Sequence, residues 1–355
     1  MTTAPTPSPR NVLTPDALTM MDAIARSGSF AAAARLLGKV PSALTYNVRQ
    51  LEDALDVLLF DRRSRQATLT AAGRELLDEG RHLLEQMDAV ANRVKRVATG
   101  WETQLGVVVD DIVSRSTMLD LCAGFYAECT VPARATTRSP AAPSSSPASP
   151  PPTRLRLRTE VMSGVWEALV TGQVDLAIGV GTDRELPGDL ARKELGALAF
   201  VFAVAPHHPL AGAREPIDDG EIVRHRAVAV ADSAHRLAPM TVHLLAGQDV
   251  LTVSDMQAKI EAQARGVGCG FVPEPMAREA IAAGRLVVRR VQRAQPIARL
   301  GYAWRVPAGR DGSARKAAPG LALRWWLERL ESATTRHALL DRYGSAGAIV
   351  EAGSA

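Results

Sequence analysis

The sequence has few of the features that mark secreted, membrane or metal-binding proteins. Its three cysteines are an odd number in a chain of 355 residues, which argues against a secreted disulfide framework. No stretch reaches the roughly 18 uncharged apolar residues that a spanning helix needs. The opening residues, MTTAPTPSPR, lack the apolar run of a signal peptide, and the seven histidines show no metal-ligand spacing. We therefore expect a cytoplasmic protein with no metal site and no membrane partner.

Catalytic motifs are missing as well. The chain has no Gly-x-Ser-x-Gly elbow, no Walker-type phosphate loop and no pair of acids with a plausible partner. We therefore expect no catalytic residues and no enzymatic activity. The net charge is only +4, so any affinity for nucleic acid has to come from locally placed groups. With 46% apolar and 23% charged residues, the composition is typical of a soluble globular protein with several domains.

The segment from Ser29 to Leu69 is the most informative part of the chain, because it predicts a helix-turn-helix. Ser29 can cap a short helix, and Gly38 stands where that helix has to end and turn. Pro41 suits the first turn of the next helix, where its missing N–H costs nothing. Apolar side chains then recur at helical spacing and predict a buried stripe: Leu44, Val48, Leu51 and Leu55.

The opposite face of this second helix and the segment after it favour DNA binding. The face presents residues that can contact base edges or phosphates: Ser42, Ala43, Thr45, Tyr46 and Arg49. Residues 60–70 then predict two short strands around a basic tip that contains Arg62, Arg63 and Arg65. Three arginines within four residues suit contact with phosphates or the minor groove. The alternatives are a helical hairpin inside a larger core and a solvated charged loop.

Residues 71–99 predict one long helix that joins two subunits. Its apolar residues advance by three, four or seven positions, as in a coiled-coil seam: Leu76, Leu83, Met87, Val90, Val94 and Val97. A helix with such a stripe and no partner in its own small domain is expected to pack against a second copy of the chain. The alternative is that the stripe packs on the core of the same chain.

The rest of the chain alternates between strand and helix patterns. Strands are predicted at 105–109, 155–161, 198–204, 227–231, 250–253 and 268–272, and residues 172–179 predict a turn that leads into a further strand. Helices are predicted at 117–128, from after residue 161 to 170, at 256–265 and at 317–331. This order predicts an α/β fold with largely parallel sheets covered by helices on both faces. A segment rich in Pro and Ser, residues 131–153, predicts a disordered insertion. We also expect a disordered tail at 1–12 and a loose tail at 336–355.

The helix-turn-helix segment resembles that of LysR-type transcriptional regulators. The resemblance extends from about Leu13 to Leu330 and is closest over the first sixty of those residues. It is carried by Phe30, Ala33, Ala34, Leu37, Ser42, Thr45, Val48, Leu51, Glu52, Leu55, Leu59, Phe60, Arg62, Leu69, Thr70 and Gly73. Asp56 departs from the family, which usually has glycine there. Aspartate tolerates the left-handed conformation less well than glycine, so strain or a different exit turn is expected.

The resemblance implies a fold and a set of partners. The fold would be a winged helix-turn-helix at 13–70, a dimerisation helix at 71–99, and an effector-binding domain at 104–310. That domain would have two Rossmann-like lobes similar to periplasmic binding proteins, lobe one at 104–204 and 273–305 and lobe two at 205–272. The partners would be double-stranded promoter DNA, further copies of the chain in a homodimer or a homotetramer (a dimer of dimers), and RNA polymerase. DNA contacts would come from Ser42, Ala43, Thr45, Tyr46, Arg49, Arg62, Arg63 and Arg65, with Arg49 as the base contact.

The resemblance also implies an unidentified small-molecule effector and no other cofactor. In such folds ligands lie at the carboxyl ends of strands and at helix N-termini. The residues at those places are Asp110, Asp111, Ser114, Ser163, Thr252 and Ser254, although each can equally cap a helix or form a turn. Asp110 and Asp111 disfavour a simple carboxylate effector and favour a ligand with hydroxyl or amine donors. Two alternatives are a solute-binding protein without a role at DNA and redox sensing through the cysteines.

Overall fold

The computed structural model describes residues 12–61, 67–129, 151–306 and 318–343. The chain divides into two compact units, with the boundary between Val94 and Lys95. In the described ranges no helix combines the length and the apolar character needed to cross a membrane.

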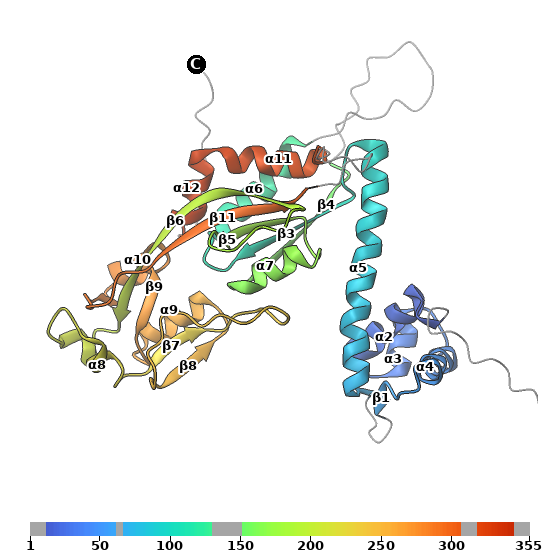
Figure 1. The fold of residues 1–355 in the computed structure, drawn as a ribbon, viewed down its shortest axis with the longest axis horizontal. Coiled ribbons are helices and arrows are strands. Elements are labelled where there is room, and N and C mark those ends of the chain that lie inside the picture. Colours follow the sequence, from blue (N-terminus) through green and yellow to red (C-terminus); the bar gives the residue numbers. More distant parts are fainter. Residues whose placement is uncertain (1–11, 62–66, 130–150, 307–317, 344–355) are drawn as a thin grey trace, which may run out of the picture. The chain divides into compact units, whose positions relative to one another are not determined.

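The first unit is a three-helix bundle followed by a short hairpin and the beginning of a long helix (Figure 1). Its elements are α2 (Pro15–Ser27), α3 (Phe30–Leu36), α4 (Pro41–Leu55), β1 (Phe60–Asp61), β2 (Thr68–Leu69) and α5 (Ala71–Thr99). Thr14 and Ser29 cap α2 and α3, since each side-chain oxygen accepts a hydrogen bond from a backbone N–H in the first turn. The predicted helix-turn-helix and its hairpin are thereby confirmed.

The turns of this unit depend on left-handed backbone conformations. Gly38 ends the first helix of the motif with a φ of +63°, and Asp56 ends α4 with a φ of 53° and a ψ of 36°. Asp56 therefore adopts the conformation that favours glycine, at a cost of about 1 kcal/mol, and the exit turn keeps the usual left-handed path.

The second unit is a mixed α/β structure. Its elements are β3 (Gln104–Asp110), α6 (Arg115–Glu128), β4 (Arg154–Glu160), α7 (Ser163–Val170), β5 (Leu176–Gly181), β6 (Leu190–Val204), η1 (Pro209–Gly212), α8 (Asp219–Ile222), β7 (Ala227–Val230), β8 (Val250–Val253), α9 (Met256–Ala264), β9 (Gly270–Pro273), α10 (Glu274–Ala282), β10 (Val287–Val288), β11 (Ile297–Arg305), α11 (Leu321–Glu331) and α12 (Ala333–Asp341). Helices α6 and α11 cover one face of the larger sheet and α7 covers the other (Figure 1). Alternate residues of β3 accordingly face two different cores, Val107 and Val109 one of them and Val108 the other.

The sequence predicted largely parallel sheets, but several strand pairs of the second unit are antiparallel. Strand β3 is parallel to β4 and β5, and β7 is parallel to β8. Strand β11 instead runs antiparallel to both β5 and β6, and β6 runs antiparallel to β9 and β10. The antiparallel pairs arise because the chain crosses between the lobes twice, once along β6 and once before β11.

The predicted division into lobes was wrong at two places. Strand β6 belongs to both lobes, because residues 190–199 pair with β11 whereas residues 200–204 pair with β9 and β10. The first crossing therefore lies inside β6, near Phe200, and not after Val204. Helix α10 and strand β10 pack against β9 and the second half of β6, so residues 274–288 belong to lobe two rather than lobe one.

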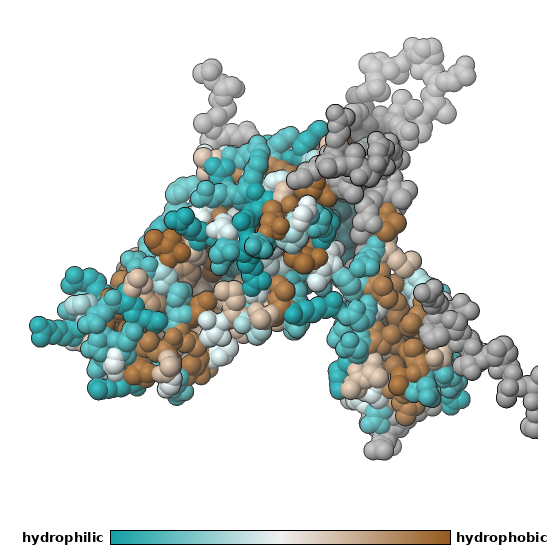
Figure 2. Space-filling model, viewed as in Figure 1, coloured by the Kyte–Doolittle hydropathy of each residue, from teal (hydrophilic) through white to brown (hydrophobic). Residues whose placement is uncertain are grey.

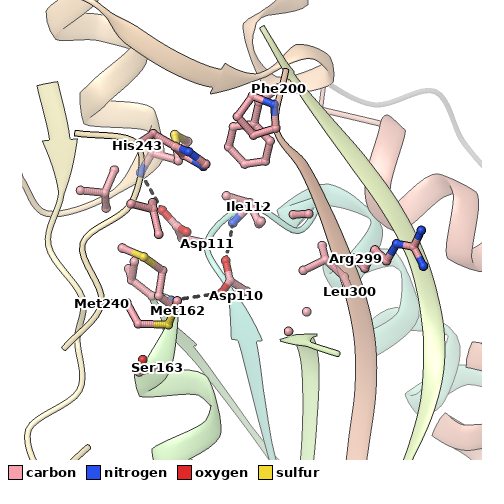
Figure 3. Close-up of a pocket in the computed structure, with 18 of the residues that line it drawn as sticks. Asp110, Asp111, Ile112, Met162, Ser163, Phe200, Met240, His243, Arg299 and Leu300 are labelled. Atoms are coloured by element: carbon pink, nitrogen blue, oxygen red, sulfur yellow. Dashed lines mark hydrogen bonds between the residues drawn. The ribbon is translucent and has the colours of Figure 1, made fainter. Parts of the chain in front are cut away.

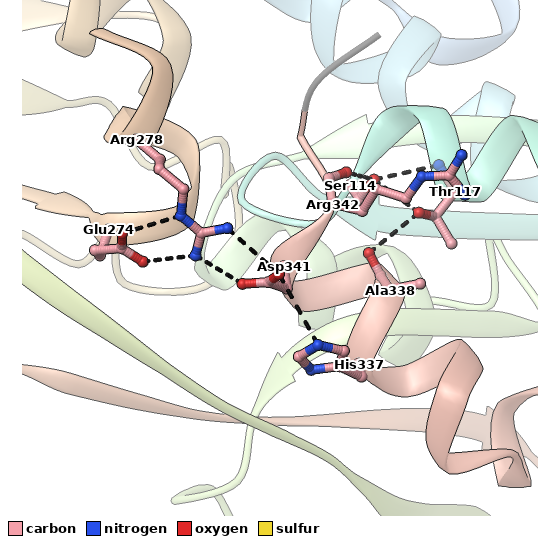
Figure 4. Close-up of polar contacts among 8 residues, drawn as sticks. All are labelled: Ser114, Thr117, Glu274, Arg278, His337, Ala338, Asp341 and Arg342. Carbon is pink, nitrogen blue, oxygen red and sulfur yellow. Dashed lines mark hydrogen bonds and ion pairs between the residues drawn. The ribbon is translucent and has the colours of Figure 1, made fainter. Parts of the chain in front are cut away.

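The C-terminal segment also differs from the prediction of a loose tail from residue 336. Residues 333–341 form α12, in which Leu339 and Leu340 are buried in the main core. Arg278 of α10 pairs with both Glu274 and Asp341, and Thr117 of α6 donates a hydrogen bond to the carbonyl of Ala338 (Figure 4). These tertiary contacts order a helix that is too short to be stable alone. Residues 344–355 lie outside the described ranges.

The other predicted disordered segments fall mostly outside the described residues, including 1–11 and 130–150. At the end of the predicted insertion 131–153, however, Thr153 is buried, and its hydroxyl donates a hydrogen bond to the carbonyl of Glu102. The insertion therefore ends earlier than predicted. The predicted helix 317–331 begins at Leu321.

Candidate functional site

Helix α4 is fixed by one face and exposes the other. Leu44, Val48 and Leu51 are buried in the core of the first unit. On the opposite face Ser42, Tyr46 and Arg49 are exposed, whereas Ala43 and Thr45 are half-buried. All five side chains predicted to contact DNA in this helix therefore lie on or beside one solvent-facing surface.

The polar groups of this surface differ in how they are held. The hydroxyl of Tyr46 accepts a hydrogen bond of 2.9 Å from the side-chain amide of Gln50. The Thr45 hydroxyl donates back to the carbonyl of Pro41. Arg49 has no ion pair or side-chain hydrogen bond to any residue that the structure describes. Its five guanidinium N–H donors are therefore available to an external partner.

The hairpin that follows α4 is anchored by Glu52, a role that the sequence analysis did not assign. Glu52 is 5% exposed, and its Oε1 accepts hydrogen bonds from the backbone N–H groups of Leu59 (2.9 Å) and Phe60 (3.3 Å). The ring of Phe60 packs edge-on against Phe30. Because β1 and β2 flank residues 62–66, Glu52 fixes the base of the predicted wing. The wing residues Arg62, Arg63 and Arg65 lie outside the described ranges.

Helix α5 carries an exposed apolar stripe beyond its first turns. Leu83, Met87 and Val90 are 48%, 53% and 49% exposed, and Figure 2 shows apolar side chains gathered over α5 on the face in view. Leu76, predicted to belong to the same stripe, instead packs against the core of its own unit. The side chain of Val94 lies outside the described residues. The exposed apolar stripe of α5 therefore begins at Leu83, about two helical turns after Leu76, where the sequence predicted it to begin.

The start of α5 lies close to the bundle because two glycines permit it. A Cβ at Gly73 would lie 2.0 Å from the carbonyl oxygen of Leu59, and one at Gly80 would lie 2.7 Å from the side chain of Leu18. This close approach explains why Leu76 packs in the core, whereas Leu83, Met87 and Val90 are exposed.

A cavity of about 500 Å³ lies between the two lobes of the second unit (Figure 3). Lobe one contributes the end of β3 and the start of α7, and lobe two contributes α9, β9 and the loop after β7. The walls are mainly apolar and include Ile112, Met162, Trp166, Phe200, Met240 and Phe271. A space of this size and character is typical of small-molecule sites.

Three of the six predicted effector residues line this cavity: Asp110, Asp111 and Ser163. Asp110 accepts hydrogen bonds of 3.2 Å from the backbone N–H groups of Ile112 and Met162, and Asp111 accepts one of 2.6 Å from Met256 in lobe two. Burial, and next the negative charge of Asp111, raise the pKa of Asp110 well above its usual value. Burial also raises the pKa of Asp111, although the Met256 hydrogen bond opposes this.

The other three predicted effector residues lie away from the cavity. Ser114 is fully buried beneath α12, where it caps α6 and its hydroxyl donates to the carbonyl of Arg342 (Figure 4). Thr252 is exposed because the alternation of β8 turns it toward solvent. Ser254 is also exposed, and its hydroxyl donates to the carboxylate of Asp255. Of the three, Ser114 has the capping role that was the alternative prediction, whereas Thr252 lies within strand β8 and Ser254 precedes Asp255, the cap of α9.

The loop between β7 and β8 forms one wall of the cavity and is fastened to lobe one. Glu167 of α7 accepts hydrogen bonds from the backbone N–H groups of His235, Arg236 and Leu237, at 2.7 to 3.2 Å. Burial alone would raise the pKa of Glu167, but these donors outweigh it and lower the pKa. Ser163 binds the same loop, since its backbone N–H donates to Asp232. The loop between β7 and β8, which belongs to lobe two and is hydrogen-bonded to lobe one, therefore bounds the cavity.

The cavity also contains two residues that the sequence analysis missed, Lys259 and His243. Lys259 is 7% exposed, and burial lowers its pKa to about 8. His243 lies beside Phe200 and Phe271, with ring centroids 6.1 and 5.6 Å away. The sequence holds a signal for Lys259, because helical spacing places it on the same face of α9 as the buried Met256 and Ile260.

The cysteines have the character of core residues. Cys129 and Cys269 are buried and Cys122 is half-buried, and all three thiols are free. Burial raises the pKa of each of them, that of Cys269 to about 11. Redox-sensing cysteines are accessible and have a lowered pKa, so these properties disfavour the redox alternative.

Both units match families of known proteins. Residues 15–74 match the family model "Bacterial regulatory helix-turn-helix protein, lysR family", and residues 147–333 match the model "LysR substrate binding domain". The chain is 38% identical over 276 residues to the probable HTH-type transcriptional regulator YhaJ of Escherichia coli K12, which covers 78% of this chain and 85% of that protein. It is 33% identical over 315 residues to the uncharacterized HTH-type transcriptional regulator YeeY of the same strain, covering 89% and 92% of the two chains.

Solved structures share the fold. The chain resembles that of CbnR, a LysR family transcriptional regulator, with a TM-score of 0.52, 17% identity and coverage of 89% of this chain and 98% of that chain. The structure of full-length CbnR complexed with its target DNA matches with the same TM-score.

Proposed function

Since this chain belongs to the LysR family of transcriptional regulators, we propose that α4 enters the major groove of promoter DNA. The observation that carries this proposal is the two-sided character of α4. One face is fixed in the core by Leu44, Val48 and Leu51, and on the other Arg49 is exposed and has no partner among the residues that the structure describes. A groove about 12 Å wide admits such a helix.

Within this proposal the residues of the surface have different roles. Arg49 would contact guanine, whose O6 and N7 a guanidinium can bind with two hydrogen bonds. Tyr46, positioned by Gln50, would pack on a thymine methyl or bind a phosphate. Ser42, Ala43 and Thr45 would complete the helix contacts. The wing residues Arg62, Arg63 and Arg65 would bind the phosphate backbone or the minor groove.

The Arg49→Ala substitution should weaken binding to the preferred DNA site by about 5- to 150-fold, equivalent to about 1–3 kcal/mol. Affinity capture of fragmented genomic DNA with the wild-type protein would first identify that site. Fluorescence anisotropy would then give the dissociation constants for the site and for a scrambled duplex at one fixed salt concentration. We expect the scrambled duplex to lose much less affinity, because only the specific complex uses the base contact.

The matched control is Arg224→Ala, which removes the same charge from an exposed side chain in the second unit. It should leave both dissociation constants close to those of the wild type. Unchanged affinity and unchanged site preference in Arg49→Ala would contradict the assigned role of Arg49. Failure of the wild type to enrich any site across several salt concentrations would contradict the proposed function itself.

We also propose that Leu83, Met87 and Val90 pack against the same stripe of a second copy. Side chains this exposed would otherwise leave a row of apolar surface on α5 in water. Two copies would then present two α4 helices to two half-sites of DNA, and two such dimers could form a tetramer. Leu76, also predicted for this interface, packs in its own unit, and the side chain of Val94 lies outside the described residues.

The Met87→Glu substitution should dissociate this assembly, because it places a charge in the centre of an apolar seam. Sedimentation velocity should show a smaller species than the wild type at the same protein concentration. The Met87→Leu variant keeps the apolar side chain and should sediment like the wild type. An unchanged assembly in Met87→Glu would assign the interface to another surface.

The cavity of the second unit is the proposed site of the effector. Asp111 joins lobe one to the N-terminus of α9, so a ligand that displaces or reinforces this contact would bias the orientation of the lobes. Such a bias can couple ligand binding to DNA binding. The output would reach transcription through RNA polymerase at the promoter, and we assign the protein no catalytic step.

A further inference from the structure

Lys259 is a buried cation that has no partner in the described part of the chain. It lines the cavity and is 7% exposed, yet it forms no ion pair or hydrogen bond with the residues that the structure describes. The lysines at 39 and 193, by contrast, pair with Asp16 and Glu331. Buried charges in proteins are normally paired, so an unpaired ammonium in a cavity wall points to an external anion.

The groups around Lys259 do not supply that anion. Asp255 is occupied by hydrogen bonds from the backbone of Ala258 and the hydroxyl of Ser254. Asp111 accepts the backbone N–H of Met256. A Cβ at Gly270 would lie 3.5 Å from the Lys259 Nζ, so the ammonium lies over bare backbone of β9. His243 and Cys269, the remaining titratable neighbours, are both held toward their uncharged forms by burial.

A second polar side chain on the same helix is also unsatisfied. Gln263 is fully buried, and neither its amide nitrogen nor its amide oxygen has a hydrogen bond to the described residues. A Cβ at Gly270 would lie 3.1 Å from that nitrogen, so Gln263 and Lys259 approach the same strand residue. Two adjacent polar groups without partners in native protein indicate an incomplete site.

The walls of the cavity limit which anion can occupy it. The apolar side chains of Trp166, Met240 and Phe271 leave little to solvate a highly charged group. Lys259 can neutralise one negative charge, and the carboxyl groups of Asp110 and Asp111 in the same lining disfavour a second. Two arginines also line the cavity, but Arg184 donates to the hydroxyl of Ser163 and Arg299 is exposed to solvent. Burial raises the pKa of Asp110, which lowers the cost of protonating its carboxyl group when an anion binds nearby.

We propose that the ligand of this cavity is a monocarboxylate with an apolar body, and that Lys259 binds its carboxylate. The inference rests on the proposed function, in which this cavity holds the effector. It reverses the expectation, drawn from Asp110 and Asp111 alone, that a simple carboxylate is disfavoured. The two acids line the same cavity and remain suited to a hydroxyl or amine donor elsewhere on the ligand.

The test compares acids with their uncharged amides on the full-length protein. The probes are benzoate and benzamide, phenylacetate and phenylacetamide, and hexanoate and hexanamide, at equal concentration and pH 7. Thermal unfolding followed by tryptophan fluorescence reports the second unit, since all five tryptophans lie at residue 101 or later. We expect at least one acid to raise the melting temperature more than its amide does, because ligands that bind the native state stabilise it.

Two substitutions assign that preference to a residue. Lys259→Met should abolish the advantage of the acid over the amide, whereas Lys193→Met, which removes an exposed ammonium, should preserve it. An acid and amide that act equally on the wild type would overturn the proposal. An acid advantage that survives in Lys259→Met would overturn it as well.

The result of the probe experiment can be distinguished from the result of the DNA-capture experiment that tests the proposed function. The probe experiment contains no DNA, and the capture of genomic DNA contains no probe. Selective DNA capture without a preference for acids would overturn only the assignment of the ligand. A preference for acids that depends on Lys259, without selective DNA capture, would support the assignment and overturn the role in transcription.

Discussion

Replacing Lys259 with methionine should raise the free energy of unfolding of the ligand-free protein by up to about 3 kcal/mol at pH 7. Burial lowers the pKa of this lysine from 10.5 to about 8, so the charged form is less stable in the folded protein than in the unfolded chain. At pH 7, below both values, the lysine is charged in both states and the full cost is present. Methionine has a similar length and needs no counterion.

The pH dependence gives this prediction a definite sign. Between pH 8 and 10.5 the folded state releases a proton that the unfolded state still holds, so the stability of the wild type rises in this window relative to that of Lys259→Met. The advantage of the methionine variant should therefore shrink from pH 7 to pH 10. Urea unfolding followed by tryptophan fluorescence measures the free energy at both values. A variant that is no more stable than the wild type at pH 7, or an advantage that does not change with pH, would contradict the prediction.

If Lys259→Met stabilises the protein, the result would also support a role for Lys259 in ligand binding. Proteins keep an unfavourable buried group where an activity requires it, and a ligand carboxylate would supply the missing charge. The Lys193→Met variant serves as the control, because that lysine is exposed and paired with Glu331. We expect it to change the free energy of unfolding by much less than Lys259→Met does.

The sequence predicted most reliably what depends on neighbouring residues. The cap at Ser29, the turn at Gly38 and the buried stripe of α4 follow from local backbone and spacing rules, and the structure has all three. Asp110 and Asp111 were located because the carboxyl end of a parallel strand faces the cleft in any fold of this type. These inferences needed no knowledge of which distant segments meet.

The errors arose where distant segments do meet. Ser114 was placed at the ligand site because α12, which covers it, had been predicted as a loose tail. That helix is ordered by contacts such as Arg278 with Asp341, and their residues are 63 apart in the chain. Lys259 was overlooked because a lysine is usually solvated, and only the packing of α9 against β9 places it in a cavity wall.

Replacing Glu52 with alanine should destabilise the first unit by about 2–4 kcal/mol and weaken DNA binding at temperatures where the unit remains folded. The substitution removes the acceptor for the N–H groups of Leu59 and Phe60, and Glu52 itself is only 5% exposed. Each buried donor left without a partner costs about 1–3 kcal/mol. Hydrogen exchange at these two amides, followed by mass spectrometry, should show faster exchange in the variant than in the wild type.

Two further variants distinguish the lost contact from a lost charge. Asp53→Ala removes an acid from the exposed side of the same helix, and it should change stability by less than about 0.5 kcal/mol. Glu52→Gln keeps an oxygen acceptor of the same reach and should fall between the wild type and Glu52→Ala. Equal exchange rates in Glu52→Ala and the wild type would mean that other contacts hold the hairpin. The graded series would instead mean that one buried side chain joins the helix proposed to read bases to the strands that flank Arg62, Arg63 and Arg65. Both parts of the proposed DNA surface would then depend on a residue that is not itself proposed to contact DNA.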